Sequence, residues 1–338
     1  MIIELTDTST QEVTRTLRSA REERGEVSTG RVLTFVVMVS APSSLGDILE
    51  PVNEAAREHP ARVIILVDSH ESPNTHLDAQ IHLGGDSGAS EVIALKLHGE
   101  LAEHTASVVT PLLLPDTPVV VWWPADAPRN VAADQLGQLA ARRITDANRD
   151  SGAEGIYRSR MTYASGDSDL GWSRITLWRG LLASTLDQPP FENVLSVEIA
   201  GPAGDASVDL AAGWLADRLS VPVTRTNTDS PLPPVDDQGL PMVSIEKTVL
   251  HREDADVTVE IKDSKTAAVS VGDRQSLVAL SPRGVGDCLA EELRHLDPDY
   301  AYGRALRGMV RVNRPPRGSH TDQVTKIYED MEGQESQR

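Results

Sequence analysis

The stretch that decides the fold of the N-terminal half is Arg31-Val-Leu-Thr-Phe-Val-Val-Met-Val-Ser40. It is almost continuously apolar, which is typical of a strand covered by helices on both faces of a parallel sheet. Residues 44–58 follow with their apolar side chains on one helical face, and Arg62-Val-Ile-Ile-Leu-Val-Asp68 is a second apolar run. Strand, helix and strand at this spacing predict a right-handed βαβ crossover and a parallel strand pair.

The same alternation continues and predicts an N-terminal α/β domain over residues 1–170, with a mostly parallel sheet flanked by helices. The expected parallel strands are Val32–Val39, Val63–Val67, Val92–Leu97 and Val119–Trp122. Strands are also expected at residues 77–83, and helices at residues 100–114 and 131–142. Gly84-Gly85-Asp86-Ser87-Gly88 lies between two of the strands and is typical of a turn.

The second half differs in the length and spacing of its apolar runs. A linking helix is expected from residue 170 to residue 186, ending at Asp187-Gln188-Pro189-Pro190. Short, closely spaced apolar runs then predict antiparallel strands, and further strands and helices surround them. We therefore expect a C-terminal mixed α/β (α+β) domain over residues 171–312. Residues 313–338 are polar and charged, and we expect a disordered tail there.

Composition restricts the function classes. The net charge is −19, which favours solubility and repels phosphate backbones, so no nucleic-acid partner is expected. The first residues lack a basic head and a long apolar run, and no window is long and apolar enough to span a membrane. Cys288 is the single cysteine, which excludes an internal disulfide and fits a reducing compartment. We expect a soluble, cytoplasmic protein without a membrane partner.

A search for catalytic and cofactor motifs mostly fails. The sequence has neither a P-loop nor a G-x-G-x-x-G opening a helix after a strand, so no cofactor is expected. Residues 84–88 and Arg283-Gly-Val-Gly-Asp287 could bind an anion, but a turn and an ordinary helix entry explain them as well. His70, His76 and His82 are loosely grouped without a helical metal motif, and His98 and His104 add no pattern. We therefore expect no metal and no catalytic residues.

Tryptophan and arginine stand out in a chain with only 4% aromatic residues. Trp122 and Trp123 end one expected strand, and Asp169-Leu-Gly-Trp-Ser-Arg-Ile-Thr-Leu-Trp-Arg179 carries two more tryptophans and two arginines. Trp and Arg dominate the hot spots of protein interfaces, although tryptophans could equally fill a seam between the domains. The candidate partner-binding residues are Trp172, Arg174, Trp178 and Arg179, with Trp122 and Trp123 as a supporting layer.

The 169–179 segment resembles the D-L-x-W-[ST]-R-[LI]-T-x-W-R segment of the OpcA family. Residues 104–124, His-Thr-Ala-Ser-Val-Val-Thr-Pro-Leu-Leu-Leu-Pro-Asp-Thr-Pro-Val-Val-Val-Trp-Trp-Pro, match the centre of that family in order and spacing. Thr29-Gly30-Arg31-Val32-Leu33-Thr34 matches its opening. The resemblance covers roughly residues 1–310.

This resemblance implies a non-catalytic effector. OpcA proteins are thought to bind glucose-6-phosphate dehydrogenase, to promote its active oligomer and to raise its activity in the oxidative pentose phosphate pathway. The family implies no catalytic residues. Thiol redox control, which is linked to some relatives, is in doubt here because Cys288 has no partner for an internal disulfide. The alternative is a sugar-phosphate-binding protein or enzyme that uses an Arg/Gly-rich anion site.

Overall fold

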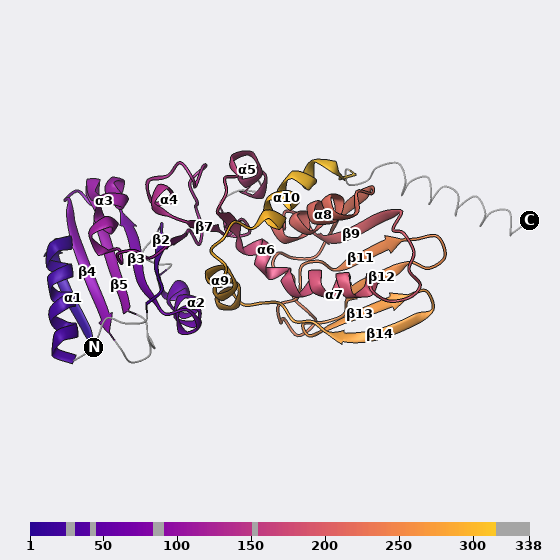
Figure 1. The fold of residues 1–338 in the computed structure, drawn as a ribbon, viewed down its shortest axis with the longest axis horizontal. Helices are drawn as coiled ribbons and strands as arrows, with labels where there is room; N and C mark the ends of the chain where they lie inside the picture. The colour runs from indigo at the N-terminus through magenta and orange to yellow at the C-terminus, as the bar shows by residue number, and fades with distance from the viewer. Residues whose placement is uncertain (25–30, 41–44, 84–90, 151–154, 316–338) are drawn as a thin grey trace, which may run out of the picture. The chain divides into compact units, whose positions relative to one another are not determined.

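The computed structural model of the chain describes residues 1–24, 31–40, 45–83, 91–150 and 155–315. The chain divides into two compact units, each built on a sheet of its own (Figure 1). Among the described residues, the first unit consists of those within 1–177 and 283–306, and the second of those within 178–282 and 307–315. The two units are described one after the other.

An eight-stranded sheet forms the centre of the first unit, in the order β1-β4-β5-β3-β2-β6-β7-β8. Its strands are β1 (Ile2–Thr8), β2 (Leu33–Val39), β3 (Ala61–Ser69), β4 (His76–Leu83), β5 (Glu91–His98), β6 (Val119–Trp122), β7 (Arg142–Thr145) and β8 (Asp167–Asp169). In this spatial order, each strand from β5 across to β8 is parallel to its neighbour. At the other edge, β4 pairs antiparallel with β5, and β1 pairs antiparallel with β4. The predicted mostly parallel sheet is therefore confirmed.

Helices cover both faces of this sheet. They are α1 (Thr10–Arg24), α2 (Leu45–Glu58), α3 (Thr105–Val109), α4 (Gln135–Leu139), α5 (Gly155–Thr162), α6 (Leu170–Arg174), α9 (Val285–Arg294) and the start of α10 (Tyr300–Gly308), with short 3-10 helices η3 (Gly99–His104) and η4 (Thr110–Leu112). Val13 of α1 packs into a core on one face. Val52 of α2 and Leu289 of α9 share a second core with Phe35 and Ile65 of the strands. Because both faces are buried, the central strands are apolar throughout.

The order of the central strands creates a switch point. β2 lies between β3 and β6, so the chain leaves β2 towards one side of the sheet and returns on the other. Parallel strands bring their carboxyl ends to one edge, and open α/β sheets bind ligands in the crevice at such a point. Ser40, Ser69 and Trp123 lie at these strand ends, on the edge where sheets of this kind bind ligands.

The second unit contains a seven-stranded mixed sheet in the order β14-β13-β12-β11-β9-β10-β15. Its elements are α7 (Thr176–Leu186), β9 (Ser196–Pro202), α8 (Ala206–Leu219), β10 (Val223–Thr228), β11 (Lys247–His251), β12 (Val257–Ile261), β13 (Thr266–Val271), β14 (Arg274–Ala279), the 3-10 helix η5 (Met309–Arg311) and β15 (Val312–Asn313). β9, β10 and β15 are parallel, and β11 to β14 form an antiparallel meander. The predicted mixed α/β class of the second half is confirmed.

Two predicted helices differ in the structure. Residues 131–142 contain only the short α4, after which Arg142 enters strand β7. Two adjacent arginines can occupy a buried strand because Glu292 and Asp167 neutralise Arg142 and Arg143. The linking helix is interrupted at Ile175, whose backbone (φ −93°, ψ 6°) leaves the helical conformation.

The expected domains 1–170 and 171–312 divide the chain at one point, whereas the two compact units divide it at more than one point. Residues 283–306 return to the first unit, because Cys288, Leu289 and Leu293 complete its second core. Val312–Asn313 forms β15, so residue 313, the first of the expected disordered tail, belongs to a strand. The rest of that expected tail, from residue 316 onward, lies outside the described residues. Across the described ranges, no helix is long and apolar enough to cross a membrane.

Candidate functional site

The segment that carries the tryptophans and arginines begins where β8 meets α6. Asp169 caps α6, because its carboxylate accepts a hydrogen bond from the Gly171 N–H at 2.8 Å. Trp172 is buried one turn later, and its Nε1–H donates to Asp299 Oδ2 at 2.7 Å. Its ring also lies against Tyr302, with centroids 6.1 Å apart. Trp172 therefore anchors α6 in the interior of the first unit.

Arg174 makes a two-pronged ion pair with a buried carboxylate. Its Nη1 and Nη2 lie 2.7 Å and 2.6 Å from the two oxygens of Asp146, which is fully buried. Burial opposes the charge of Arg174, but the Asp146 carboxylate raises its pKa overall. A bidentate pair of this kind fixes both partners in orientation as well as in charge. Arg174 is thus engaged inside the protein.

A second buried carboxylate lies beside this pair. Asp169 Oδ2 accepts hydrogen bonds from Thr145 Oγ1 at 2.7 Å and from the Ala147 N–H at 2.9 Å. Burial, together with the negative charge of Asp146, raises the pKa of Asp169 to about 7. This carboxyl therefore keeps its proton to a higher pH than an ordinary aspartate does.

Helix α9 closes the network from the other side. The Glu292 carboxylate accepts hydrogen bonds from Ser173 Oγ and from Arg142, whose Nη1 also donates to the Asp297 carbonyl at 3.0 Å. Arg283 donates to the Ser173 carbonyl at 2.8 Å and pairs with Glu291. We call Asp146, Asp169, Arg174, Ser173, Glu292 and Arg142 the signature network. It joins α6 to β7 and to α9, three segments that are far apart in the sequence.

The remaining candidate residues occupy three further places. Trp122 stacks on Phe35 at 6.4 Å in the core that α2 and α9 share, whereas Trp123 belongs to the core on the opposite face. Trp178 is buried in the second unit and meets Trp214 edge-on at 6.1 Å. Arg179 follows it and is half-buried. The six candidates thus form no single exposed patch, and four of them are buried tryptophans.

The carboxyl edge at the switch point carries a hollow of about 320 Å³. Ser40, Trp123 and Gln135 line it together with four carboxylates, those of Asp68, Glu103, Asp126 and Asp134. Ser40 Oγ donates to Asp126 Oδ2 at 2.9 Å. The described lining residues include no basic side chain, so the hollow is a poor place for a phosphate or a pyrophosphate.

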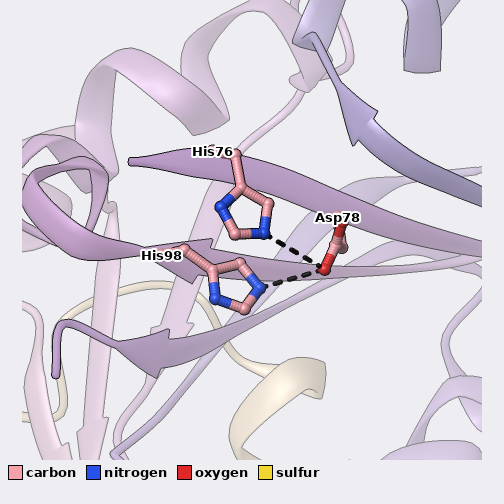
Figure 2. Close-up of side chains that lie close together, drawn as sticks. All are labelled: His76, Asp78 and His98. Carbon is pink, nitrogen blue, oxygen red and sulfur yellow. Dashed lines mark hydrogen bonds and ion pairs between the residues drawn. The ribbon is translucent and has the colours of Figure 1, made fainter. Parts of the chain in front are cut away.

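A third polar group lies on the outer strands of the same sheet. The His76, Asp78 and His98 side chains gather on one face, and both imidazoles point to the same carboxylate oxygen (Figure 2). The sequence pattern missed His98, because residue spacing along the chain cannot reveal a partner on the neighbouring strand. The strand register, with His76 directly opposite His98, supplies that information.

Cys288 is unreactive in this setting. It is fully buried in α9, and burial raises the pKa of its thiol to about 12. The thiolate is the reactive form of cysteine, so at neutral pH this side chain packs as a small apolar residue. Cys288 therefore belongs to the second core of the first unit.

Comparison with solved structures gives distant likenesses. The 3-ketoreductase KijD10 of Actinomadura kijaniata, solved in complex with NADP, is 11% identical, covers 84% of this chain and 99% of its own, and has a TM-score of 0.45. A Gfo/Idh/MocA family oxidoreductase of Vibrio cholerae is 11% identical, covers 88% and 99%, and has a TM-score of 0.39.

Comparison by sequence is more specific. A protein of Synechococcus elongatus described as a putative OxPP cycle protein OpcA is 28% identical over 189 residues. The match covers 49% of this chain and 41% of that protein, so this chain spans less than half the length of that relative. Residues 52–161 match the N-terminal domain, and residues 165–306 the C-terminal domain, of a family described as glucose-6-phosphate dehydrogenase subunit. The chain belongs to this family, the OpcA glucose-6-phosphate dehydrogenase assembly proteins.

Proposed function

We propose that this protein is a non-catalytic effector that binds glucose-6-phosphate dehydrogenase and promotes its assembly and activity in the oxidative pentose phosphate pathway. The observation that carries the proposal is the match of both halves of the chain to domains described as a subunit of that enzyme. The named role of the Synechococcus relative in the same pathway supports it.

The state of the polar residues favours an effector over an enzyme. The alternative function needs arginines that can receive a phosphate, but Arg174 is paired with Asp146 and Arg283 with Glu291. The glycine-rich stretch at 84–88 lies outside the described residues. The hollow at the switch point is lined by carboxylates, which repel the pyrophosphate of a dinucleotide. A sugar-phosphate site built on Arg174 is therefore less well supported.

The candidate partner-binding residues divide into two roles under this proposal. Trp122, Trp123, Trp172 and Arg174 are buried or engaged inside the first unit, so they would hold a binding surface in place without contacting the partner. Trp178 and Arg179 start the long helix α7 of the second unit, and Arg179 keeps part of its side chain at the surface. We propose Arg179 as the member of the set that contacts the dehydrogenase.

The proposal is tested with the purified cognate dehydrogenase and the full chain. Adding the chain should raise the initial rate of NADPH formation and move the dehydrogenase to a larger mass in light scattering. The chain by itself should produce no NADPH from glucose 6-phosphate. A mass shift without a change in rate would reduce the protein to a scaffold, and neither effect at micromolar concentrations would overturn the proposal.

A substitution at Arg179 tests the assigned contact. Arg179→Ala should weaken activation at least about tenfold in apparent affinity, which corresponds to about 1.4 kcal/mol. Arg218→Ala is the matched control, because Arg218 is an exposed arginine on α8 of the same unit. Equal effects of the two substitutions would show only that net charge matters, and normal activation by Arg179→Ala would remove Arg179 from the contact.

A further inference from the structure

The His76, Asp78 and His98 side chains come from two neighbouring strands at the outer part of the first sheet. β4 and β5 are antiparallel with His76 opposite His98, and Asp78 lies two residues further along β4 on the same face. One ligand atom from each of the three residues lies within 4.8 Å of the other two. Strand geometry therefore brings together two imidazoles and a carboxylate that the sequence separates by up to 22 residues.

The ligand atoms are held by neighbouring groups. His76 Nε2 lies 3.7 Å and His98 Nε2 lies 3.0 Å from the same Asp78 oxygen, Oδ2 (Figure 2). The other oxygen, Oδ1, accepts a hydrogen bond from the Asp7 N–H at 3.0 Å. This bond fixes the orientation of the carboxylate, so that Oδ2 faces both rings.

The ring nitrogen of His76 that faces away from Asp78 has a backbone partner. His76 Nδ1 lies 3.3 Å from the Asn74 carbonyl, which can only accept a hydrogen bond. A proton on Nδ1 would leave Nε2, the atom that faces Asp78 Oδ2, available as a metal ligand. A backbone carbonyl on the distant ring nitrogen is also the usual support of a metal-binding histidine.

We propose that His76, Asp78 and His98 bind one divalent transition-metal ion, with Zn²⁺ as the ion that best fits the donor set. Two imidazole nitrogens and one carboxylate oxygen are typical zinc ligands, and further positions would be filled by water. His98 also lines a hollow of about 420 Å³. The ion would join β4 to β5 and, through the Asp7–Asp78 hydrogen bond, to β1.

Two features of the surroundings shape the expected affinity. The rings are stacked, with centroids 3.9 Å apart and planes within 8°, so one ring must turn before both lone pairs converge on an ion. His76 is the ring with room to turn, since about a quarter of its side chain is exposed (26%). Lys96 stands opposite Asp78 on β5 and is exposed, so its positive charge opposes the binding of a cation.

The experiment uses the full chain without an affinity tag, stripped of metal with a chelator. Zn²⁺ is titrated in competition with a chromophoric chelator, and Co²⁺ is added separately to record its visible absorption. We expect one equivalent of bound Zn²⁺. His76→Gln and Asp78→Asn should each weaken binding at least tenfold. His82→Gln should bind like the parent chain, because His82 lies on the same face of β4 but outside the group.

A second measurement needs no variant and so does not depend on the folding of the substituted chains. In ¹⁵N-labelled parent protein, one equivalent of Zn²⁺ should shift the side-chain Nε2 signals of two of the nine histidines. Absence of these shifts, or a loss of affinity in His82→Gln equal to that in His76→Gln, would overturn the proposal. Binding of Zn²⁺ that survives both His76→Gln and Asp78→Asn unchanged would do the same.

Discussion

The signature network and the His76–Asp78–His98 group are both clusters of charged and polar side chains in the first unit, yet they differ in how their hydrogen bonds are arranged. In the signature network each carboxylate accepts hydrogen bonds from donors. Asp146 accepts them from Nη1 and Nη2 of Arg174, and Asp169 accepts them from Thr145 Oγ1 and two backbone N–H groups. In the histidine group, by contrast, two imidazoles share one carboxylate oxygen, which lies 3.7 Å from His76 Nε2 and 3.0 Å from His98 Nε2. Separate donors for each carboxylate fix structure, whereas three potential ligand atoms that converge on one place can gain from an ion.

This difference bears on how the family segment should be understood. Residue types that are common at interfaces, Trp and Arg, fill the 169–179 segment, and yet Trp172 and Arg174 are used to hold helix α6 in the interior. A bidentate pair and a buried indole tolerate few replacements, so packing and hydrogen bonding inside the protein are enough to explain why these two residue types occur here.

The largest effect should come from breaking the signature network. Arg174→Met leaves Asp146 buried without its cation and should lower the free energy of unfolding by about 3–5 kcal/mol, measured by urea titration. The control is Arg294→Met, which removes the more exposed pair with Glu58 and should cost about 1 kcal/mol or less. Equal costs for the two substitutions would mean that the network is not what holds α6.

Removing one hydrogen bond should have a smaller effect. Trp172→Phe leaves Asp299 Oδ2 without the indole donor and should cost about 1–3 kcal/mol beyond the loss of apolar area. Trp178→Phe is the matched comparison, because its buried Nε1 meets no acceptor among the described residues. Chemical unfolding should therefore show Trp172→Phe as the more destabilising change, and the reverse order would contradict the assigned hydrogen bond.

The pH dependence of stability should reveal Asp169. Its pKa is raised to about 7 in the folded protein, above the ordinary value near 3.8, so the folded state binds more protons between these two pH values. Stability contributed by this group therefore falls as pH rises towards 7, with a slope of up to about 1.4 kcal/mol per pH unit. Unfolding midpoints at pH 5 and pH 7.5 measure this fall in stability. Asp169→Asn should reduce the dependence of stability on pH. An unchanged slope would assign the dependence to another carboxyl.

The smallest expected effect concerns the histidine group. Lys96→Met removes the positive charge opposite Asp78 and should tighten Zn²⁺ binding roughly twofold to fivefold, because exposed charges interact by about 1 kcal/mol or less. The measurement is the chelator competition already described, repeated at 0.05 M and about 0.5 M salt, where screening should shrink the difference. Weaker binding after Lys96→Met would place the lysine among the groups that support the ion.

Several central strands of the first sheet can be predicted from local sequence pattern. Arg31–Ser40 and Arg62–Asp68 are apolar enough to be central strands from their composition alone, and both form them. β7 could not be predicted in this way, since its Arg142 and Arg143 become compatible with a buried strand only through Glu292 and Asp167, which lie 150 and 24 residues away. Long-range neutralisation of this kind leaves no trace in a window of neighbouring residues.

The candidate site was predictable only in part. Unusual tryptophans and arginines drew attention to the 169–179 segment, but side-chain type does not say whether Arg174 meets solvent or Asp146. The histidine group depends on the register of β4 and β5, which a count along the chain does not give. Both gaps have one cause, namely that contacts between distant segments decide where a polar side chain points.

The return of residues 283–306 to the first unit has a consequence for synthesis on the ribosome. Helix α9 supplies Cys288, Leu289 and Leu293 to the core that α2 and the central strands begin. A nascent chain that has emerged only to residue 282 therefore has strands β9 to β14 of the second sheet but not yet helix α9 of the first unit. Ile48 and Val52 are then without their α9 partners. Such a face is a natural place for a chaperone to bind, and translation that stops early would leave it uncovered.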